Sequence, residues 1–184
     1  MYISSIDTYI IENPKCASRT IAHTVNDMFE EKDISLEGHI FFDEIIEKIP
    51  VSAKIYGIVR NPVDRLISGV RYWCDTIEKV DHHLEQLIKG LVKNKRSAPY
   101  MLYEPQSTYV KEQPRVEIYT FEDINKFLKE LGWRKEIKKF NQGHYEISKE
   151  EIKNRALFDK VLSRYSFDFN LYDRVMNMRS LQNA

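Results

Sequence analysis

Residues 8–20 read TYIIENPKCASRT, and this stretch decides the fold. Thr8–Glu12 is mainly β-branched or aromatic and is followed at once by Asn-Pro, so it predicts a short buried strand that runs into a loop. Beyond the loop, Arg19–Glu31 carries apolar residues at helical spacing, and Ser18 is suited to be the N-cap of that helix. A strand, a short loop and a helix in this order open an α/β unit.

The same pattern recurs along the chain. Lys54–Val59 predicts a second buried strand, ended by Arg60-Asn61, and Pro62 suits the first position of the next helix. Val116–Tyr119 predicts a third strand. Strands alternating with helices predict a single α/β domain over residues 1–184, with a parallel sheet flanked by helices on both faces. Further helices are expected at Phe41–Ile49, Leu84–Val92, Phe121–Leu131 (ended by Gly132) and Ile152–Tyr165. The last of these helices is expected to continue over Leu171–Met176, and Asn94–Gln113 is expected to be a long loop.

Composition limits the classes of function. The 184 residues carry 28 basic and 28 acidic side chains, so zero net charge offers no long-range attraction to nucleic acid or to an anionic membrane. No run approaches the roughly 18 apolar residues of a membrane span, and the first residues are too polar for a signal peptide. Cys16 and Cys74 suggest neither a disulfide framework nor, with the five histidines, a metal site. We therefore expect a cytoplasmic protein without metal, nucleic-acid or membrane partners.

The loop Asn13–Ser18 predicts a P-loop-like strand-loop-helix phosphate site. Ligands of parallel sheets bind beyond the carboxyl ends of the strands, where a helix N-terminus offers free N–H groups. Lys15 adds a cation, and Ser18 and Thr20 add hydroxyl donors. The nucleotide loop GxxxxGK[ST] is absent, and Ala22 stands where a phosphatase loop beginning at Cys16 would need Arg. From this loop alone, an ordinary strand-to-helix connection stays open.

A second candidate anion site follows the second strand. Arg60 stands at the strand end, where a guanidinium fork can hold a phosphate. Ser68 comes eight residues later, about two helical turns along the next helix. Arg65 and Arg71 are either further anion contacts or partners in charge pairs on the helix surface, for example with Asp64.

These two segments together resemble the sulfotransferases that use 3′-phosphoadenosine-5′-phosphosulfate (PAPS), particularly the branch acting on glycosaminoglycans and other carbohydrates. The first family motif, P-K-x-x-x-[ST]-[ST], is matched at Pro14-Lys15 and Thr20, whereas Arg19 stands where the family commonly has a small hydroxyl residue. The second motif, V-R-[DN]-P-x-x-R-x-x-S-x-x-R, is matched at every fixed position by residues 59–71 and is the more specific of the two. The resemblance implies that Arg60 and Ser68 hold the 3′-phosphate of the donor. It also implies that the first loop holds the 5′-phosphosulfate through Lys15, Cys16, Ala17, Ser18, Arg19 and Thr20.

Three further segments are similar to the family. Pro105-Gln106 resembles its substrate-side loop, which implies substrate contacts for Gln106, and we expect Arg65 to contact substrate as well. Residues 141–144, Asn-Gln-Gly-His, resemble a late cofactor loop, which implies Asn141 and Gly143 as cofactor contacts. Residues 168–172 resemble a D-F-x-L-Y ending.

Sulfuryl transfer needs a base, and histidine is the usual one near neutral pH. His39 lies in a stretch, residues 37–43, that resembles the segment carrying the catalytic histidine of the glycosaminoglycan 2-O-sulfotransferases. We expect in-line attack, with His39 taking the acceptor proton and Lys15 near the bridging oxygen. Glu37 or Asp43 is the alternative base. The remaining histidines are expected on the surface or in packing (His23), in solvent (His82, His83) or near the cofactor (His144).

Two other functions stay open. One is a nucleotide-dependent phosphoryl transferase, which would need a Walker-type loop and carboxylates for magnesium. The other is a catalytically inactive module that binds the bisphosphate product PAP or an anionic glycan. The acceptor is expected to be a carbohydrate. Tyr100, Tyr103 and Tyr109 would stack on its sugar rings or, equally, form the core of the loop Asn94–Gln113. A homo-oligomer whose second subunit completes the acceptor cleft also stays open.

Overall fold

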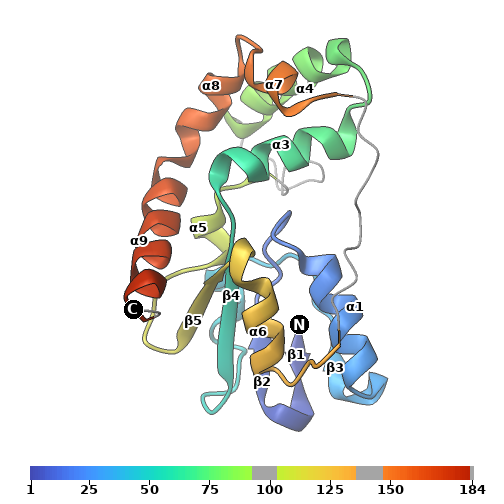
Figure 1. The fold of residues 1–184 in the computed structure, drawn as a ribbon, viewed down its shortest axis with the longest axis vertical. Helices are drawn as coiled ribbons and strands as arrows, with labels where there is room; N and C mark the ends of the chain where they lie inside the picture. The colour runs from blue at the N-terminus through green and yellow to red at the C-terminus, as the bar shows by residue number, and fades with distance from the viewer. Residues whose placement is uncertain (93–102, 136–146, 183–184) are drawn as a thin grey trace.

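A computed structural model describes residues 1–92, 103–135 and 147–182, and its centre is a five-stranded sheet of order β3-β1-β2-β4-β5 (Figure 1). The strands are β1 (Tyr2–Ile3), β2 (Thr8–Ile10), β3 (Ile34–Ser35), β4 (Lys54–Val59) and β5 (Val116–Thr120). β2, β4 and β5 are parallel, as predicted, whereas β1 is antiparallel to both β2 and β3. The prediction of a wholly parallel sheet was therefore wrong at one edge, and the sheet is mixed.

That edge forms because the chain turns back tightly before β2. A 3-10 turn at Ser4–Ile6 ends at Asp7, whose φ of 45° lies in the left-handed region, and the turn pairs Ile3 with Thr8. Strands of two residues are too short to show an alternating pattern, so nothing in the sequence indicated β1 or β3.

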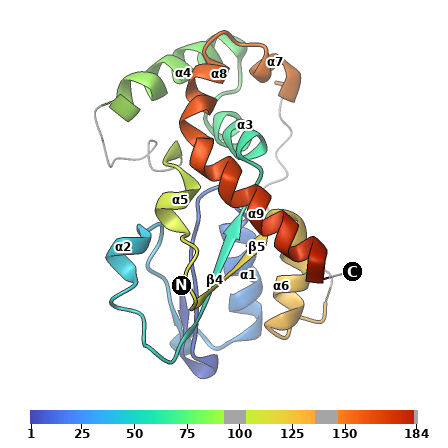
Figure 2. The same cartoon turned by 90° about the vertical axis from the view of Figure 1, so that its left-hand side faces the viewer.

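Helices cover both faces of the sheet, as predicted (Figure 2). On one face, apolar side chains of the strands pack with α1 and α6, and on the other with α2, α5 and α9. The first face is covered by α1 (Ser18–Met28) and α6 (Ile124–Glu130), and the second by α2 (Phe42–Ile45), α5 (Gln106–Tyr109) and α9 (Ser166–Gln182).

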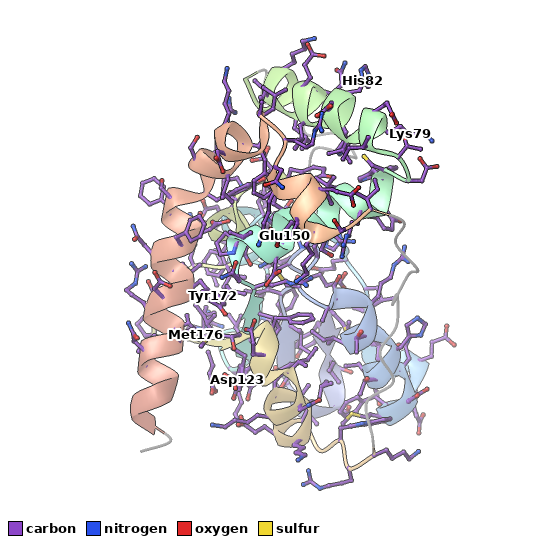
Figure 3. The ribbon with its side chains drawn as sticks, turned by 45° about the horizontal axis from the view of Figure 1, so that its top comes forward. Lys79, His82, Asp123, Glu150, Tyr172 and Met176 are labelled. Carbon is purple, nitrogen blue, oxygen red and sulfur yellow. The ribbon has the colours of Figure 1, made fainter. Side chains whose placement is uncertain are left out.

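A cluster of helices stands beyond the carboxyl ends of β2, β4 and β5 (Figure 1). It consists of α3 (Pro62–Trp73), α4 (Ile77–Val92), α7 (Lys149–Lys153) and α8 (Phe158–Leu162). Lys79 and His82, both on α4, lie on the outer side of this cluster (Figure 3). Buried Tyr103 lies against Gly69 of α3, where an added Cβ would meet the ring at 2.7 Å. α3 therefore joins the sheet, at the end of β4, to the helical cluster.

Several helix boundaries differ from those predicted. α2 has four residues rather than nine. α4 begins at Ile77 rather than Leu84, and most of the residues between these two positions are polar. The helix predicted over Ile152–Tyr165 is α7, α8 and a 3-10 turn at Ser163–Tyr165, followed at once by α9. A capping box of Ser148 and Glu151 starts α7 before the predicted position. Pro62 begins α3 and Gly132, with φ of 105°, follows α6, both as predicted.

Candidate functional site

The two loops singled out from the sequence meet beyond the carboxyl ends of β2 and β4. Arg60 directly follows β4, and its Nη1 donates a hydrogen bond to the carbonyl of Lys15 at 3.2 Å. Arg65, in the first turns of α3, donates from Nε to the carbonyl of Pro14 at 3.0 Å. Both arginines thus hold the backbone of the β2–α1 loop, across some fifty residues of intervening sequence in each case.

The loop between β2 and α1 contains two residues with positive φ. Lys15 and Ala17 have φ of 63° and 65°, in the left-handed region where residues other than glycine are uncommon. Such residues turn backbone N–H groups toward one side and form anion-binding concavities. Ala17, not Ser18, is the N-cap of α1, which corrects the prediction, and it makes no side-chain cap bond. The first turn of α1 carries no acidic residue, so the positive end of the helix dipole is not offset by a carboxylate of that turn.

Lys15 is half-buried in positive surroundings. Its ammonium lies 4.3 Å from the centre of the Tyr72 ring on α3. Burial, and after it the neighbouring cations Arg60 and Arg19, lower the pKa of Lys15 to about 8. Arg19 also reaches Tyr72, with Nη2 donating to its hydroxyl at 3.4 Å. An anion bound here would relieve the mutual repulsion of these cations.

Ser68 faces the same loop. It follows Arg65 by three residues and precedes Tyr72 by four, and residues at these helical spacings share one face. Because Arg65 and Tyr72 both contact the β2–α1 loop, the hydroxyl of Ser68 lies on the loop side of α3. Ser68 is partly exposed, whereas Arg65 is 3% exposed and its Nη2 is buried with no hydrogen-bond partner in the described part of the chain.

His39 also reaches the start of this loop. It lies between β3 and α2, and its Nδ1 is 2.6 Å from the carbonyl of Glu12, the residue before Asn13. A carbonyl only accepts, so Nδ1 carries the hydrogen, and in the neutral ring Nε2 keeps the lone pair that a base needs. The alternative bases are engaged elsewhere: Glu37 accepts from the Tyr9 hydroxyl and Asp43 from Lys111.

The other histidines lie away from the loop or outside the described residues. His23 and His82 are exposed, in line with the surface positions predicted for them. His83 was predicted to be solvated, but it is half-buried, and its Nε2 lies 2.7 Å from the Tyr103 hydroxyl. Burial lowers the pKa of His83. His144, Asn141 and Gly143 fall outside the described residues.

Cys16 and Gln106 have their polar groups engaged within the protein. The Cys16 N–H donates to Asn13, and its Sγ donates to Oε1 of Gln106 at 3.2 Å. Burial raises the pKa of the Cys16 thiol to about 12. Gln106 is fully buried at the start of α5, and its amide bonds to the backbone of Arg60.

The tyrosines considered for ring stacking belong to the core. Tyr103 is 1% exposed in the helical cluster and Tyr109 is fully buried against the sheet, while Tyr100 lies outside the described residues. Three residues of the site were missed from the sequence: Asn13 and Asp168 as buried hydrogen-bonding groups, and Tyr72 as the ring beneath Lys15. An Asn before Pro and an aromatic residue on a helix carry no signal of such long-range contacts.

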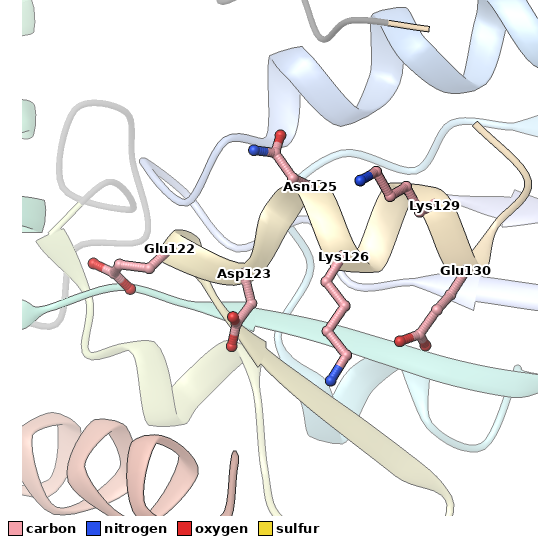
Figure 4. A pocket seen from close by; sticks show the side chains of 6 residues that line it. All are labelled: Glu122, Asp123, Asn125, Lys126, Lys129 and Glu130. Atoms are coloured by element: carbon pink, nitrogen blue, oxygen red, sulfur yellow. The ribbon is translucent and has the colours of Figure 1, made fainter. Parts of the chain in front are cut away.

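A shallow pocket lies elsewhere, along α6 (Figure 4). All the side chains that line it are charged or carry an amide: Glu122, Asp123, Asn125, Lys126, Lys129 and Glu130. None of the predicted site residues is among them. In the described ranges no group of three His, Cys, Asp or Glu residues is placed to hold a metal ion. No helix there is long and apolar enough to cross a bilayer.

Comparison with known proteins adds no relative: no family model, no curated protein and no solved structure matched this chain.

Proposed function

We propose that this protein transfers a sulfuryl group from PAPS to a hydroxyl group of a carbohydrate and releases PAP. The observation that carries the proposal is the hydrogen bond from Arg60 to the backbone of Lys15. Two segments whose motifs resemble the 5′- and 3′-phosphate sites of sulfotransferases are far apart in the sequence and adjacent in the fold. A single ligand with phosphates at both positions accounts for that pairing better than ATP does.

Each segment has a role in holding the donor. The N–H groups at the start of α1, with the hydroxyls of Ser18 and Thr20, bind the 5′-phosphate. Arg60 and Ser68 bind the 3′-phosphate from the end of β4 and the loop side of α3. Lys15 is assigned to the oxygen that joins phosphate to sulfate, because its ammonium lies among cations that an anion would neutralise.

His39 supplies the proton chemistry. Its Nε2 takes the proton of the acceptor hydroxyl while that oxygen forms a bond to sulfur. The bond from sulfur to the 5′-phosphate oxygen breaks with its electrons, and Lys15 stabilises the charge left on PAP. The hydrogen bond to Glu12 fixes the ring in the tautomer this step requires. A carbohydrate acceptor is proposed from the resemblance of residues 37–43 alone.

Incubation with radiolabelled PAPS and a panel of glycans, peptides and small alcohols tests the proposal. We expect label on a glycan, no requirement for magnesium, and stoichiometric release of PAP. The Lys15→Ala protein is the matched control, and it should transfer no label. Tight PAP binding with no transfer to any acceptor in the panel would instead favour the inactive binding module.

A further inference from the structure

The two proposed phosphate sites are tied together by one buried side chain, the amide of Gln106. Oε1 accepts from the backbone N–H of Arg60 at 2.8 Å, and Nε2 donates to the carbonyl of the same residue at 2.8 Å. The amide therefore pairs with both backbone groups of Arg60, as a neighbouring strand would. This fixes the backbone from which the Arg60 guanidinium projects.

The same oxygen of Gln106 also contacts the β2–α1 loop. It accepts from Sγ of Cys16 at 3.2 Å and lies 3.4 Å from Nδ2 of Asn13. Asn13 in turn donates to the carbonyl of Ile58 on β4 at 2.9 Å. One buried amide group thus bonds to residues of both loops, and a shift of one loop is transmitted to the other through it.

Gln106 is itself anchored by the last helix. Asp168 of α9 accepts from the N–H groups of Gln106 at 2.7 Å and of Ser107 at 3.0 Å, and so caps α5. Gln106 is fully buried and Asp168 is 1% exposed, so neither side chain is free to adopt other positions in solvent. Breaking these bonds would leave several buried groups without partners, which is unfavourable.

We infer that Gln106 is a positioning residue that fixes the separation of the two phosphate sites and so sets the preference for a nucleotide phosphorylated at both its 5′ and 3′ positions. The inference rests on the proposed function, and it replaces the substrate contact that the resemblance implied for Gln106. Its reason is geometric. Two sites that bind one rigid ligand increase its affinity only when the distance between the sites matches the distance between the two phosphates of the ligand.

The test measures binding of PAP, 5′-AMP and 3′-AMP by calorimetry to the wild type and to Gln106→Met, which keeps the volume but loses both the acceptor and the donor of the amide. In the wild type PAP should bind more tightly than either monophosphate. In the variant the affinity for PAP should fall roughly 10- to 100-fold, while the affinities for the monophosphates change by less than about threefold, because each site persists but the two no longer match. Gln106→Glu keeps the acceptor but replaces the donor with an oxygen that faces the Arg60 carbonyl, so its loss of PAP affinity should be at least as large.

Two comparisons separate positioning from general loss of stability. Leu87→Ala removes a fully buried side chain of α4 in the helical cluster, and it should lower the melting temperature without changing the ratio of PAP to 5′-AMP affinity. If Gln106→Met does not fold, Gln106→Glu carries the test. An unchanged ratio in the Gln106 variants, or an equal fall for all three nucleotides, would overturn the inference while leaving the proposed function intact. A wild type with no preference for PAP would overturn both.

Discussion

Lys15 is a lysine whose surroundings disfavour its own charge. Its ammonium lies over the Tyr72 ring, and no carboxylate among the described residues pairs with it. Burial lowers its pKa most, and Arg60, Arg19 and Arg65 lower it further. A stable protein has little reason to keep such an arrangement for its fold, since burying an unpaired cation is unfavourable. We propose that a bound anion is the partner of this ammonium, because lysines with strongly lowered pKa values are typical of binding sites.

The pH dependence of PAP binding follows from that pKa. The protonated ammonium binds the anion and its pKa is lowered to about 8, so affinity should be full below this pH and fall as the pH rises through it. Phosphates are already ionised there, since their second pKa is about 6. Calorimetry on both sides of this pH measures the effect. In Lys15→Arg the charge persists, so the fall should disappear; an equal fall in that variant would assign the dependence to another group.

His39→Ala should separate catalysis from binding. Loss of a general base typically lowers turnover by about 10²- to 10⁴-fold, whereas the side chain bonds to the backbone of Glu12 and is not among the proposed phosphate donors. Transfer assays and PAP calorimetry on the same protein give both quantities. His23→Ala, an exposed histidine of α1, is the matched control. Near-normal turnover in His39→Ala would reject the role.

The closeness of Lys15 and Arg60 was predictable, because each follows the end of a parallel strand, and a hydrogen bond joins the two residues. The roles of Lys15, Arg60 and Ser68 in binding phosphate stay predictions. The contacts of Gln106 and Tyr72 depend on residues tens of positions away, so no local pattern reports them. The substrate contact expected for Gln106 came instead from the resemblance of Pro105-Gln106 to a loop of the family.

Among the elements, α3 links the site to the rest of the fold. Asn61 caps it by accepting from the N–H groups of Val63 and Asp64, and Pro62 presets its first turn. Its loop side carries Arg65, Ser68 and Tyr72, and its opposite side packs in the helical cluster. The direction of α3 therefore decides where the Ser68 hydroxyl lies.

Ser68→Ala tests that direction. A hydrogen bond to a charged group contributes about 1.5–3 kcal/mol, so PAP affinity should fall roughly 10- to 100-fold with little change in stability. Ser163→Ala, an exposed serine of the 3-10 turn before α9, is the control and should bind PAP as the wild type does. Calorimetry measures both. An unchanged affinity in Ser68→Ala would place the 3′-phosphate elsewhere.

Elements were predictable in proportion to the length and regularity of their patterns. β4 matches its predicted bounds because six residues lie between clear stops. The start of α7 was missed because a capping box, rather than apolar spacing, sets it. α2 ends early, four residues after Phe41, although its apolar residues continue to Ile49 in the core.

At the scale of the whole molecule, the site lies where the sheet meets the helical cluster. Gly69 allows the close approach of α3 to Tyr103, whose hydroxyl and carbonyl are held by His83 and Tyr165. These contacts hold the helical cluster in place beside the two loops. Alternation of strands and helices predicted the layers of the sheet, but the arrangement of the cluster depends on contacts between distant helices.

Gly69→Ala should destabilise the protein and weaken PAP binding. Alanine favours a helix over glycine by about 1 kcal/mol, but its Cβ would lie 2.7 Å from the buried Tyr103 ring. Such overpacking costs about 1–3 kcal/mol, so the clash is expected to prevail, with a net loss of up to about 2 kcal/mol. Urea denaturation measures the free energy of unfolding. A gain in stability would show that α3 accommodates the methyl group without moving.

Binding of PAP in the absence of magnesium tests the central claim most directly. Calorimetry should give PAP an affinity at least about tenfold higher than that of ATP, with or without magnesium, because only PAP engages both phosphate sites. Lys15→Ala and Arg60→Ala should each remove most of this advantage. Equal or tighter binding of ATP with magnesium, or PAP binding that survives both substitutions, would contradict the account.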